Sequence, residues 1–231
     1  MLSIITINKD NRHGLQKTIA SLEHLQQGSY QWVFIDSASS DGSVDLANQF
    51  AKSGDIVISE PDTGIYNAMN KGARIATKDK ILFLNSGDTL AKNISSIDIL
   101  HLNPSADVTL FGFWIRNRLR MPRSNSWRFW SMPTSHQAMI YSRKLLLQEP
   151  YDEQYRFAAD FEHYLRINRY PLTIQTREQA LIVNEPYGSD AHLPELLAEY
   201  RDALLKNGYP RWWANSVYWL KTYYLEWALK K

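Results

Sequence analysis

Cysteine is absent from the 231 residues of the sequence, which excludes disulfide bonds and any zinc site ligated by cysteine. A chain without cysteine suits a reducing compartment, and we expect a cytoplasmic location. No apolar run approaches the roughly 18 residues that a transmembrane helix requires. The first ten residues, MLSIITINKD, contain no basic leader, so we expect no signal peptide. The net charge of only +2 gives no reason to expect nucleic acid as a partner.

The two common glycine-rich motifs for phosphate binding are also missing. No G-x-G-x-x-G follows the first expected strand, and G-x-x-x-x-G-K-[ST] occurs nowhere. The usual dinucleotide-binding fold and the P-loop are therefore excluded. A nucleotide bound by this chain would need a cation, in place of a glycine-rich loop, for its pyrophosphate.

Hydrophobic patterning in the first hundred residues alternates between strands and helices. Apolar runs with the length of buried strands occur at residues 3–7, 31–35, 55–59 and 81–84. Segments that we expect to be helical lie between them, at 15–25, 44–53 and from 65 onward. This alternation predicts an α/β fold with a parallel, doubly wound sheet. The length suits one domain with an appendage, so we expect a catalytic domain over 1–190, divided near residue 100, and a helical extension over 191–231.

Polar residues end the buried strand at 81–84 abruptly, in the turn Asn85-Ser86-Gly87-Asp88. Ligands of open α/β sheets bind at the carboxyl ends of the strands, which places Asp88 at a ligand-binding edge. The helix from residue 65 adds three polar residues spaced along one face, Asn67, Asn70 and Lys71. Together these groups suit a phosphate-bearing ligand with a divalent cation.

Each of these residues also has an ordinary structural alternative. The acids Asp36, Asp41 and Asp88 could be turn residues or helix N-caps, and the cap is the stronger interpretation for Asp41. Lys71 could be a solvated helix lysine.

Four motifs, IITIN, IDSASSDGS, EPDTGIYNAMNKG and FLNSGD, resemble those of the family-two inverting glycosyltransferases with the A-type fold. More narrowly, they resemble bacterial transferases of colanic-acid and related exopolysaccharide clusters. The resemblance covers about residues 1–190 and implies a mostly parallel central sheet flanked by helices. It also implies a nucleotide diphosphate sugar of the UDP or GDP type as donor, with Mn²⁺ or Mg²⁺ as cofactor.

By this resemblance Asp36 contacts the nucleotide base, and Asp88 is the metal-binding acid of a D-x-D-type turn. The turn departs from its acidic form, because Asn85 and Gly87 stand where carboxylates are common. Metal affinity should therefore depend mainly on Asp88 and the diphosphate oxygens. The expected nucleotide-sugar-binding residues are Thr6, Asn8, Asp36, Asp62, Asn67, Asn70, Lys71 and Ser86.

Three residues in the second half are candidates for catalysis. Asp160 lies in or just before the first turn of a helix expected to run to about Asn168, where the helix dipole favours an ionised carboxylate. In the resembling family an acid at this place is the catalytic base, with Glu162 as a second candidate; an N-cap is the alternative for Asp160. His136 opens an HQA triplet in an expected strand over 135–141. It could assist the leaving diphosphate or the metal, or be structural.

Arginine and aromatic residues alternate in the segment that follows an expected strand over 107–114. They are Trp114, Arg116, Arg118, Arg120, Arg123, Trp127, Arg128, Phe129 and Trp130. Such a segment can follow a phosphate backbone, bind a diphosphate or lie on a membrane surface, and an exposed hairpin with solvated charges is the alternative. The resembling family has its acceptor-facing segment here, so we expect a polyprenyl-diphosphate-linked glycan as acceptor.

The aromatic content of 13% is concentrated toward the C-terminus, in an expected helix from Pro210 to Lys231. Its residues include Trp212, Trp213, Tyr218, Trp219, Tyr223, Tyr224 and Trp227, with Lys221, Lys230 and Lys231. This composition suits the headgroup region of a bilayer, on the inner face of the plasma membrane. Packing against the domain or against a twin subunit in a homodimer is the alternative. The stretch from Glu185 to Ser189 resembles a degraded G-G-[VI]-S turn of the family.

Together with these patterns, the resemblance implies a metal-dependent inverting glycosyltransferase that extends a lipid-linked glycan in bacterial surface polysaccharide synthesis, such as a capsule or O-antigen. A sugar-phosphate nucleotidyltransferase is a second hypothesis, but the early glycine-rich basic loop of that class is missing from Asn8-Lys9-Asp10-Asn11-Arg12. A non-catalytic module that binds sugar nucleotides or glycans is a third.

Overall fold

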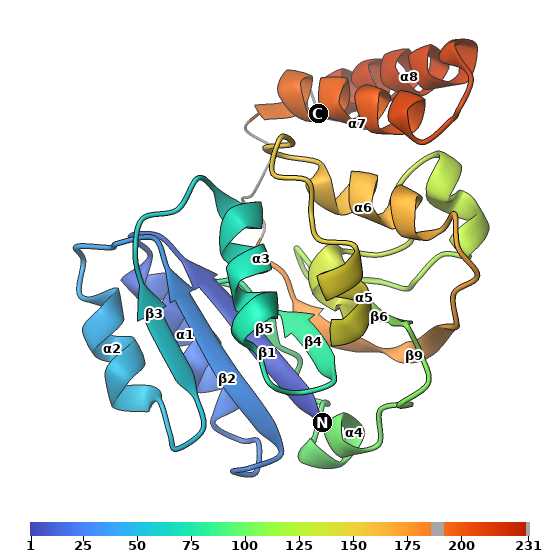
Figure 1. Cartoon of the computed structure of the whole chain (residues 1–231). Coiled ribbons are helices and arrows are strands. Elements are labelled where there is room, and N and C mark those ends of the chain that lie inside the picture. Colours follow the sequence, from blue (N-terminus) through green and yellow to red (C-terminus); the bar gives the residue numbers. More distant parts are fainter. Residues whose placement is uncertain (186–191, 230–231) are drawn as a thin grey trace.

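The computed structural model describes residues 1–185 and 192–229, and a single mixed β-sheet forms its centre (Figure 1). The strands lie in the order β3-β2-β1-β4-β8-β6-β9-β5, and β7 pairs with β6. Their bounds are β1 Leu2–Asn8, β2 Tyr30–Asp36, β3 Ile56–Ser59, β4 Lys80–Phe83, β5 Thr89–Leu90, β6 Val108–Ile115, β7 Arg118–Arg120, β8 Met139–Ser142 and β9 Ile174–Val183. The helices are α1 Arg12–Leu22, α2 Ser43–Phe50, α3 Ile65–Ile75, α4 Ser96–Leu100, α5 Arg143–Gln148, α6 Ala159–Ile167, α7 Leu193–Lys206 and α8 Arg211–Leu229, with 3-10 turns η1 Asn125–Phe129 and η2 His136–Ala138.

The first four strands form the parallel half of the sheet. β1 pairs with both β2 and β4, and β2 pairs with β3, all in parallel register. Every residue of β1 is buried, which suits its run of β-branched side chains between two covered faces. The register sets Asn8 opposite Asp36, so the polar residues that end β1 and β2 meet at one edge.

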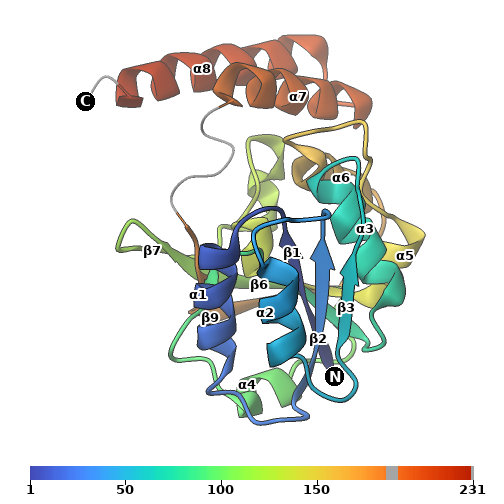
Figure 2. The ribbon, with the colours of Figure 1, turned by 90° about the vertical axis from the view of Figure 1, so that its left-hand side faces the viewer.

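Helices cover both faces of this sheet, with α1 and α2 on one side and α3, α5 and α6 on the other (Figures 1 and 2). Because successive strand side chains point to opposite faces, Ile4 packs in the core with Leu15 of α1, and Ile5 packs in the core with Met69 of α3. At Gly72 helix α3 comes so close that an added Cβ would lie 2.5 Å from Ile5 Cγ2. This contact brings the N-terminal end of α3 to the polar edge of the sheet.

The α/β class and the parallel first half are confirmed, whereas the second half is mixed. β8 pairs antiparallel with both β4 and β6. The strand expected over 135–141 begins only at Met139, because residues 136–138 form the turn η2. Helix α1 begins at Arg12, earlier than expected, where Asn11 caps it by accepting a hydrogen bond from Gly14 N–H at 3.0 Å.

The C-terminal helices α7 and α8 lie together above α6 (Figure 2). Ala203 and Leu204 of α7 and Ala214 and Val217 of α8 belong to the same buried cluster as α6. No helix in the described part of the chain is long and apolar enough to cross a membrane. The expected turn at 186–189, the side chain of Trp227, and Lys230 and Lys231 lie outside the described residues.

Candidate functional site

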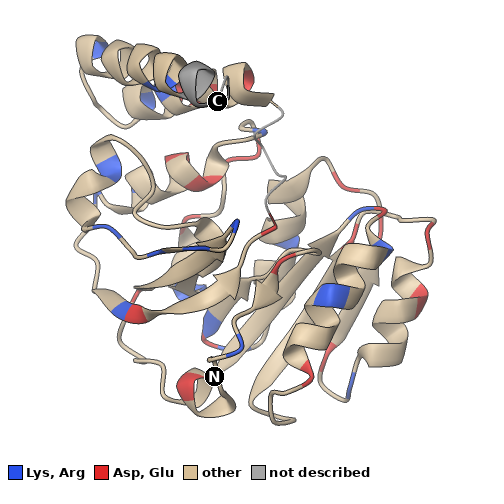
Figure 3. Ribbon diagram, turned by 180° about the vertical axis from the view of Figure 1, so that it is seen from behind, with Lys and Arg blue, Asp and Glu red and all other residues tan. Residues whose placement is uncertain are grey.

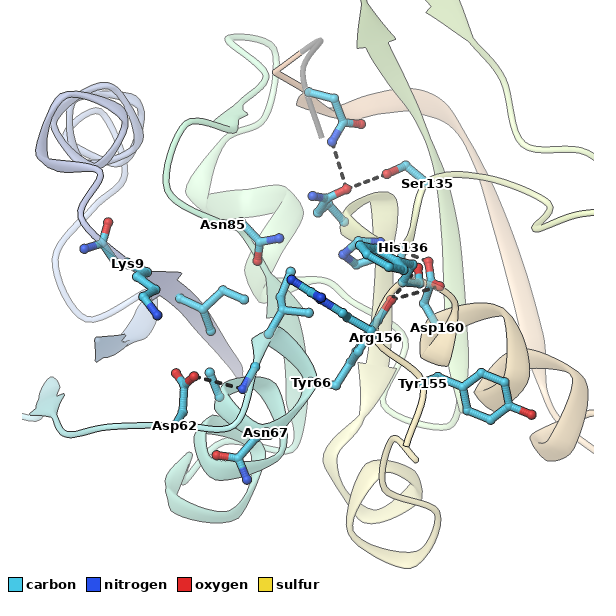
Figure 4. Close-up of a pocket in the computed structure, with 18 of the residues that line it drawn as sticks. Lys9, Asp62, Tyr66, Asn67, Asn85, Ser135, His136, Tyr155, Arg156 and Asp160 are labelled. Carbon is cyan, nitrogen blue, oxygen red and sulfur yellow. Dashed lines mark hydrogen bonds and ion pairs between the residues drawn. The ribbon is translucent and has the colours of Figure 1, made fainter. Parts of the chain in front are cut away.

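A pocket of about 1100 Å³ opens where the carboxyl edge of the parallel strands meets the second half of the chain (Figure 4). Asn8 is the last residue of β1, Asn85 follows β4, and the first turn of α3 completes this side. The opposite side consists of η2 and the segment from Glu153 to Asp160 that leads into α6. The pocket therefore lies at the edge where open α/β sheets bind ligands.

Asp160 is held in the first turn of α6 by three hydrogen-bond donors. Its Oδ1 accepts hydrogen bonds from Phe161 N–H at 2.8 Å and from the Tyr66 hydroxyl at 3.2 Å. Its Oδ2 lies 3.2 Å from Nδ1 of His136. Burial would raise the pKa of Asp160, but these bonds and the charge of His136 hold that pKa below its ordinary value. Asp160 is thus ionised at neutral pH, as a proton acceptor must be.

His136 is oriented by this carboxylate. Since an ionised carboxylate only accepts hydrogen bonds, Nδ1 carries a proton in this contact. Nε2 is buried and has no hydrogen-bond partner in the described part of the chain. The structure therefore brings His136 and Asp160 together, as one pair on the pocket wall (Figure 4).

Asp36 is a buried residue at the end of β2 and does not line the pocket. It is fully buried and accepts hydrogen bonds from Asn8 Nδ2 at 2.8 Å, Ser39 N–H at 2.8 Å and Ser59 Oγ at 2.7 Å. Burial would raise the pKa of Asp36, and these hydrogen bonds hold it below its ordinary value. Asn8 does line the pocket, and its buried Oδ1 has no partner among the described residues. Asn8 can therefore accept a hydrogen bond from a ligand.

Asp88 is buried behind the pocket, where its carboxylate is already hydrogen-bonded. Oδ1 accepts from Glu185 N–H at 2.7 Å and from Asn184 Nδ2 at 3.2 Å, and Oδ2 accepts from Gln137 Nε2 at 2.7 Å. Burial raises the pKa of Asp88, although the hydrogen bonds oppose this shift. Asp88 thus ties the turn after β4 to η2 and to the end of β9.

This arrangement does not fit a cation held mainly by the protein. Mg²⁺ in enzyme sites usually needs one or two carboxylates besides the phosphates of its substrate. Asp88 is the only carboxylate of its turn. It does not line the pocket, and three donors from residues that do line it already engage its carboxylate. Within residues 1–185 and 192–229, no three His, Cys, Asp or Glu side chains form a group that could hold a metal ion.

The start of α3 places some of the expected residues at the pocket and turns others away. Asp62 and Asn67 line it. Asn67 and Asn70 each donate a hydrogen bond to Glu153 at 2.8 Å, and Asn70 also bonds Tyr151, so Asn70 joins α3 to the second half. Lys71 does not line the pocket, and its Nζ is ion-paired with Glu60 at 2.8 Å.

Three other expected site residues also lie off the pocket lining. Thr6 is buried in β1 and accepts a hydrogen bond from Trp32 Nε1 at 3.0 Å. Ser86 contributes a carbonyl that accepts from Asn11 Nδ2 at 3.0 Å. Glu162 points away from Asp160 and is ion-paired with Arg166 at 3.1 Å, so the structure does not support it as a second base.

Several pocket residues were not expected from the sequence. Tyr66, Gln137, Glu153, Arg156 and Asn184 all line the pocket. Tyr66 belongs to the motif EPDTGIYNAMNKG, and Glu153 and Arg156 precede Asp160 in the segment YDEQYRFAAD. Their nearness to quoted motifs was the available signal, but nothing in the sequence shows which way their side chains point.

Comparisons with known proteins identify the family of this chain. The model of the family described as Glycosyl transferase family 2 matches residues 3–157. A PGL/p-HBAD biosynthesis glycosyltransferase of Mycobacterium bovis is 30% identical over 202 residues, which cover 79% of this chain and 75% of the relative.

Solved structures of glycosyltransferases share the fold. S. aureus TarS 1–349 in complex with UDP-GlcNAc superposes with a TM-score of 0.68 at 15% identity, over 94% of this chain and 70% of that chain. The mannosyltransferase PcManGT from Pyrobaculum calidifontis, in complex with GDP-Man and Mn²⁺, gives a TM-score of 0.66 at 14% identity, over 89% and 63%. The fold is therefore GT-A-like, and the chain belongs to glycosyl transferase family 2.

Proposed function

We propose that this chain transfers a sugar from a nucleoside diphosphate sugar to a glycan hydroxyl, with inversion at the anomeric carbon. The observation that carries the proposal is the ionised Asp160, paired with His136 across the pocket from the strand edge that holds Asn8 and Asn85. Base and donor-binding edge thus face each other over one cavity. This is the arrangement that an in-line displacement needs.

In the proposed reaction the acceptor oxygen forms a bond to the anomeric carbon as the bond from that carbon to the diphosphate oxygen breaks. The electron pair leaves with the diphosphate, and the proton of the acceptor hydroxyl passes to Asp160. His136 and Tyr66 position the carboxylate through their hydrogen bonds to its two oxygens. Their bonds also keep Asp160 ionised before the reaction begins.

The donor is expected on the strand side of the pocket, where Asn8, Asp62 and Asn67 reach the cavity. Asp36 acts by positioning Asn8. Neighbours of the same fold are solved with UDP-GlcNAc and with GDP-Man, which supports a nucleotide sugar of one of these types. The Mn²⁺ of PcManGT supports a divalent cation as cofactor, whereas the engaged carboxylate of Asp88 does not.

The acceptor that we propose is a glycan linked to a polyprenyl diphosphate, as in exopolysaccharide synthesis. Phe113, Ile115, Met132 and Phe157 give the pocket an apolar wall on the side of the second half. Exposed arginines follow on β7, and Figure 3 marks the basic residues along this hairpin. An apolar wall beside basic residues suits a lipid diphosphate.

We further propose that α8 attaches the protein to the inner face of the plasma membrane. Trp212, Trp219 and Tyr223 are 69%, 67% and 74% exposed, and their spacing places them along one side of the helix. Tryptophan and tyrosine are the residues that favour the bilayer interface. Lys221 does not contribute to this surface, because its Nζ lies 4.2 Å over the Tyr200 ring.

The decisive experiment measures release of nucleoside diphosphate from UDP- and GDP-sugars with a synthetic polyprenyl-diphosphate-linked monosaccharide as acceptor. We expect one donor to react and Asp160→Asn to slow its reaction by about a hundred- to ten-thousand-fold. The variant should keep its affinity for the nucleoside diphosphate, since Asp160 lies on the acceptor side. Full activity in Asp160→Asn would contradict the assigned base, and NMR of the product tests inversion.

A parallel assay with a nucleoside triphosphate and a sugar 1-phosphate distinguishes a sugar-phosphate nucleotidyltransferase. That reaction releases pyrophosphate from a nucleoside triphosphate and a sugar 1-phosphate. Pyrophosphate release without any sugar transfer would replace the proposed function. Binding of sugar nucleotides with neither product formed would indicate a non-catalytic module.

A further inference from the structure

Negative charge grows on the leaving diphosphate as the glycosidic bond breaks, so a transferase pocket needs positive charge beside it. The turn from Asn85 to Asp88 offers little to hold a cation there, because Asp88 is buried and engaged by three donors. Positively charged side chains in the pocket are the other source of such charge.

Arg156 is placed to supply it. Its side chain extends from the segment before α6 across the middle of the pocket, toward the side where Asn85 lies (Figure 4). No carboxylate in the described part of the chain is ion-paired with its guanidinium, whose Cζ lies 5.2 Å from the ring centroid of Phe157. Arg166, by contrast, is ion-paired with both Glu149 and Glu162. The Arg156 guanidinium is therefore available for an anion in the cavity.

The backbone that carries Arg156 is fixed from outside the pocket. The carboxylate of Glu199 on α7 accepts three hydrogen bonds from consecutive N–H groups, of Arg156 at 2.9 Å and of Phe157 and Ala158 at 2.8 Å each. A charged acceptor bound by three donors holds this segment in one conformation. The guanidinium thus extends from an ordered support.

The positions of Arg156 and Asp160 match the two ends of a displacement reaction. Asp160 lies against His136 on the wall of the second half, whereas the guanidinium of Arg156 extends toward the strand edge (Figure 4). The base and the leaving group of an in-line displacement lie on opposite sides of the reacting carbon. A single segment, from Arg156 to Asp160, can therefore serve both sides.

We propose that Arg156 binds the diphosphate of the nucleotide sugar and stabilises the leaving nucleoside diphosphate. The inference rests on the proposed function and identifies the side chain that binds the leaving group of the proposed reaction. When the anomeric bond breaks, the electron pair remains on the diphosphate oxygen, and the N–H groups of Arg156 can donate hydrogen bonds to that oxygen. The planar guanidinium can bind two phosphate oxygens at once, which a lysine cannot do.

Calorimetric titration of the full chain with UDP, UMP, GDP and GMP tests this inference, first with EDTA and then with Mn²⁺. We expect Arg156→Gln to weaken binding of the preferred diphosphate by about 10- to 100-fold, because the variant loses charge-assisted hydrogen bonds to the phosphate. The affinity for the matching monophosphate should change by less than about twofold, because the contact is with the second phosphate. Arg156→Lys should retain part of the affinity.

Arg177→Gln, on the exposed part of β9, is the matched control for loss of one positive charge. Thermal unfolding of each variant shows whether it is folded. Two results for Arg156→Gln would overturn the inference: an unchanged diphosphate affinity, or an equal loss of affinity for diphosphate and monophosphate. Either result would leave the proposed function standing. Failure of the wild-type chain to bind any of the four nucleotides under either condition overturns the proposed function itself.

Discussion

The contact between Glu199 and the segment before α6 makes helix α7 part of the support of the candidate active site. One oxygen of Glu199 accepts from Arg156 N–H, and the other accepts from both Phe157 N–H and Ala158 N–H. Glu199→Ala would leave all three N–H groups without this acceptor. We predict that the variant loses stability and weakens binding of a nucleoside diphosphate.

The expected loss of stability follows from the number and kind of these hydrogen bonds. A hydrogen bond to a charged group contributes about 1.5–3 kcal/mol. Glu199 is only half-buried, so water replaces part of what is lost, and the three contributions do not add. We expect Glu199→Ala to lower the free energy of unfolding by about 2–4 kcal/mol. Glu199→Gln should lose less, because its carbonyl oxygen can still accept hydrogen bonds from Phe157 and Ala158.

Urea unfolding of the wild type, Glu199→Ala and Glu199→Gln measures these differences, with Glu195→Ala as the control. Glu195 is an exposed acid on the same helix. Titration with UDP and GDP shows whether a loosened segment also weakens diphosphate binding. A Glu199→Ala protein within about 0.5 kcal/mol of the Glu195→Ala control would refute this account of the contact.

Three further predictions concern the strand edge, the ion pair of Glu162 and the aromatic helix. Asp36→Asn should lower the free energy of unfolding by about 1–3 kcal/mol at neutral pH. The pKa of Asp36 is lower in the folded than in the unfolded chain, so its ionised carboxylate stabilises the fold above the unfolded pKa, and this stabilisation is lost as the pH falls. Urea unfolding should therefore show that the difference in unfolding free energy between Asp36→Asn and wild type shrinks below about pH 4. Glu162→Gln breaks a buried ion pair and should lower the free energy of unfolding by about 2–4 kcal/mol in the same method. Its nucleotide affinity should stay within about twofold of wild type, and a large loss of affinity would contradict a purely structural role. Less of the double variant Trp212→Ala, Trp219→Ala should co-sediment with phosphatidylglycerol vesicles than of the wild type, by several-fold. Wild-type dimers that form through this surface without lipid, in a concentration-dependent way, would instead assign the surface to a second copy of the chain.

The strand edge was predictable because its signals are local in the sequence. Buried runs ending in polar turns located β1, β2 and β4, and the helical spacing after residue 65 located α3. The same patterns indicate which residues lie near the edge, but not which side chains reach the cavity. Thr6 and Asp36 lie at the edge as expected, and both point into buried hydrogen bonds. A sequence pattern fixes the position along a strand, whereas the direction of a polar side chain depends on partners that the fold supplies.

Contacts between distant segments account for most of what the sequence did not reveal. Asp88 looked free at the end of its strand, yet Gln137 and Asn184 and the backbone of Glu185 surround its carboxylate. Asn70 was expected to bind a ligand, and it binds Glu153 and Tyr151 from another part of the chain instead. None of these pairs is closer than 49 residues in the sequence, so no local pattern could have indicated them.

Contacts with distant segments also give the C-terminal extension a role that its sequence did not indicate. The sequence suggested an appendage, because α7 and α8 follow the last strand and carry unusual aromatic residues. In the structure α7 binds the segment that carries Arg156 through Glu199, and α8 donates a hydrogen bond from Trp213 Nε1 to the carbonyl of Phe129 at 2.9 Å. The same two helices therefore support the pocket from one side and present exposed tryptophans on the other. If α8 lies on a membrane as we propose, attachment would act on the helix pair that orders the catalytic segment, so lipid binding and diphosphate affinity should be coupled.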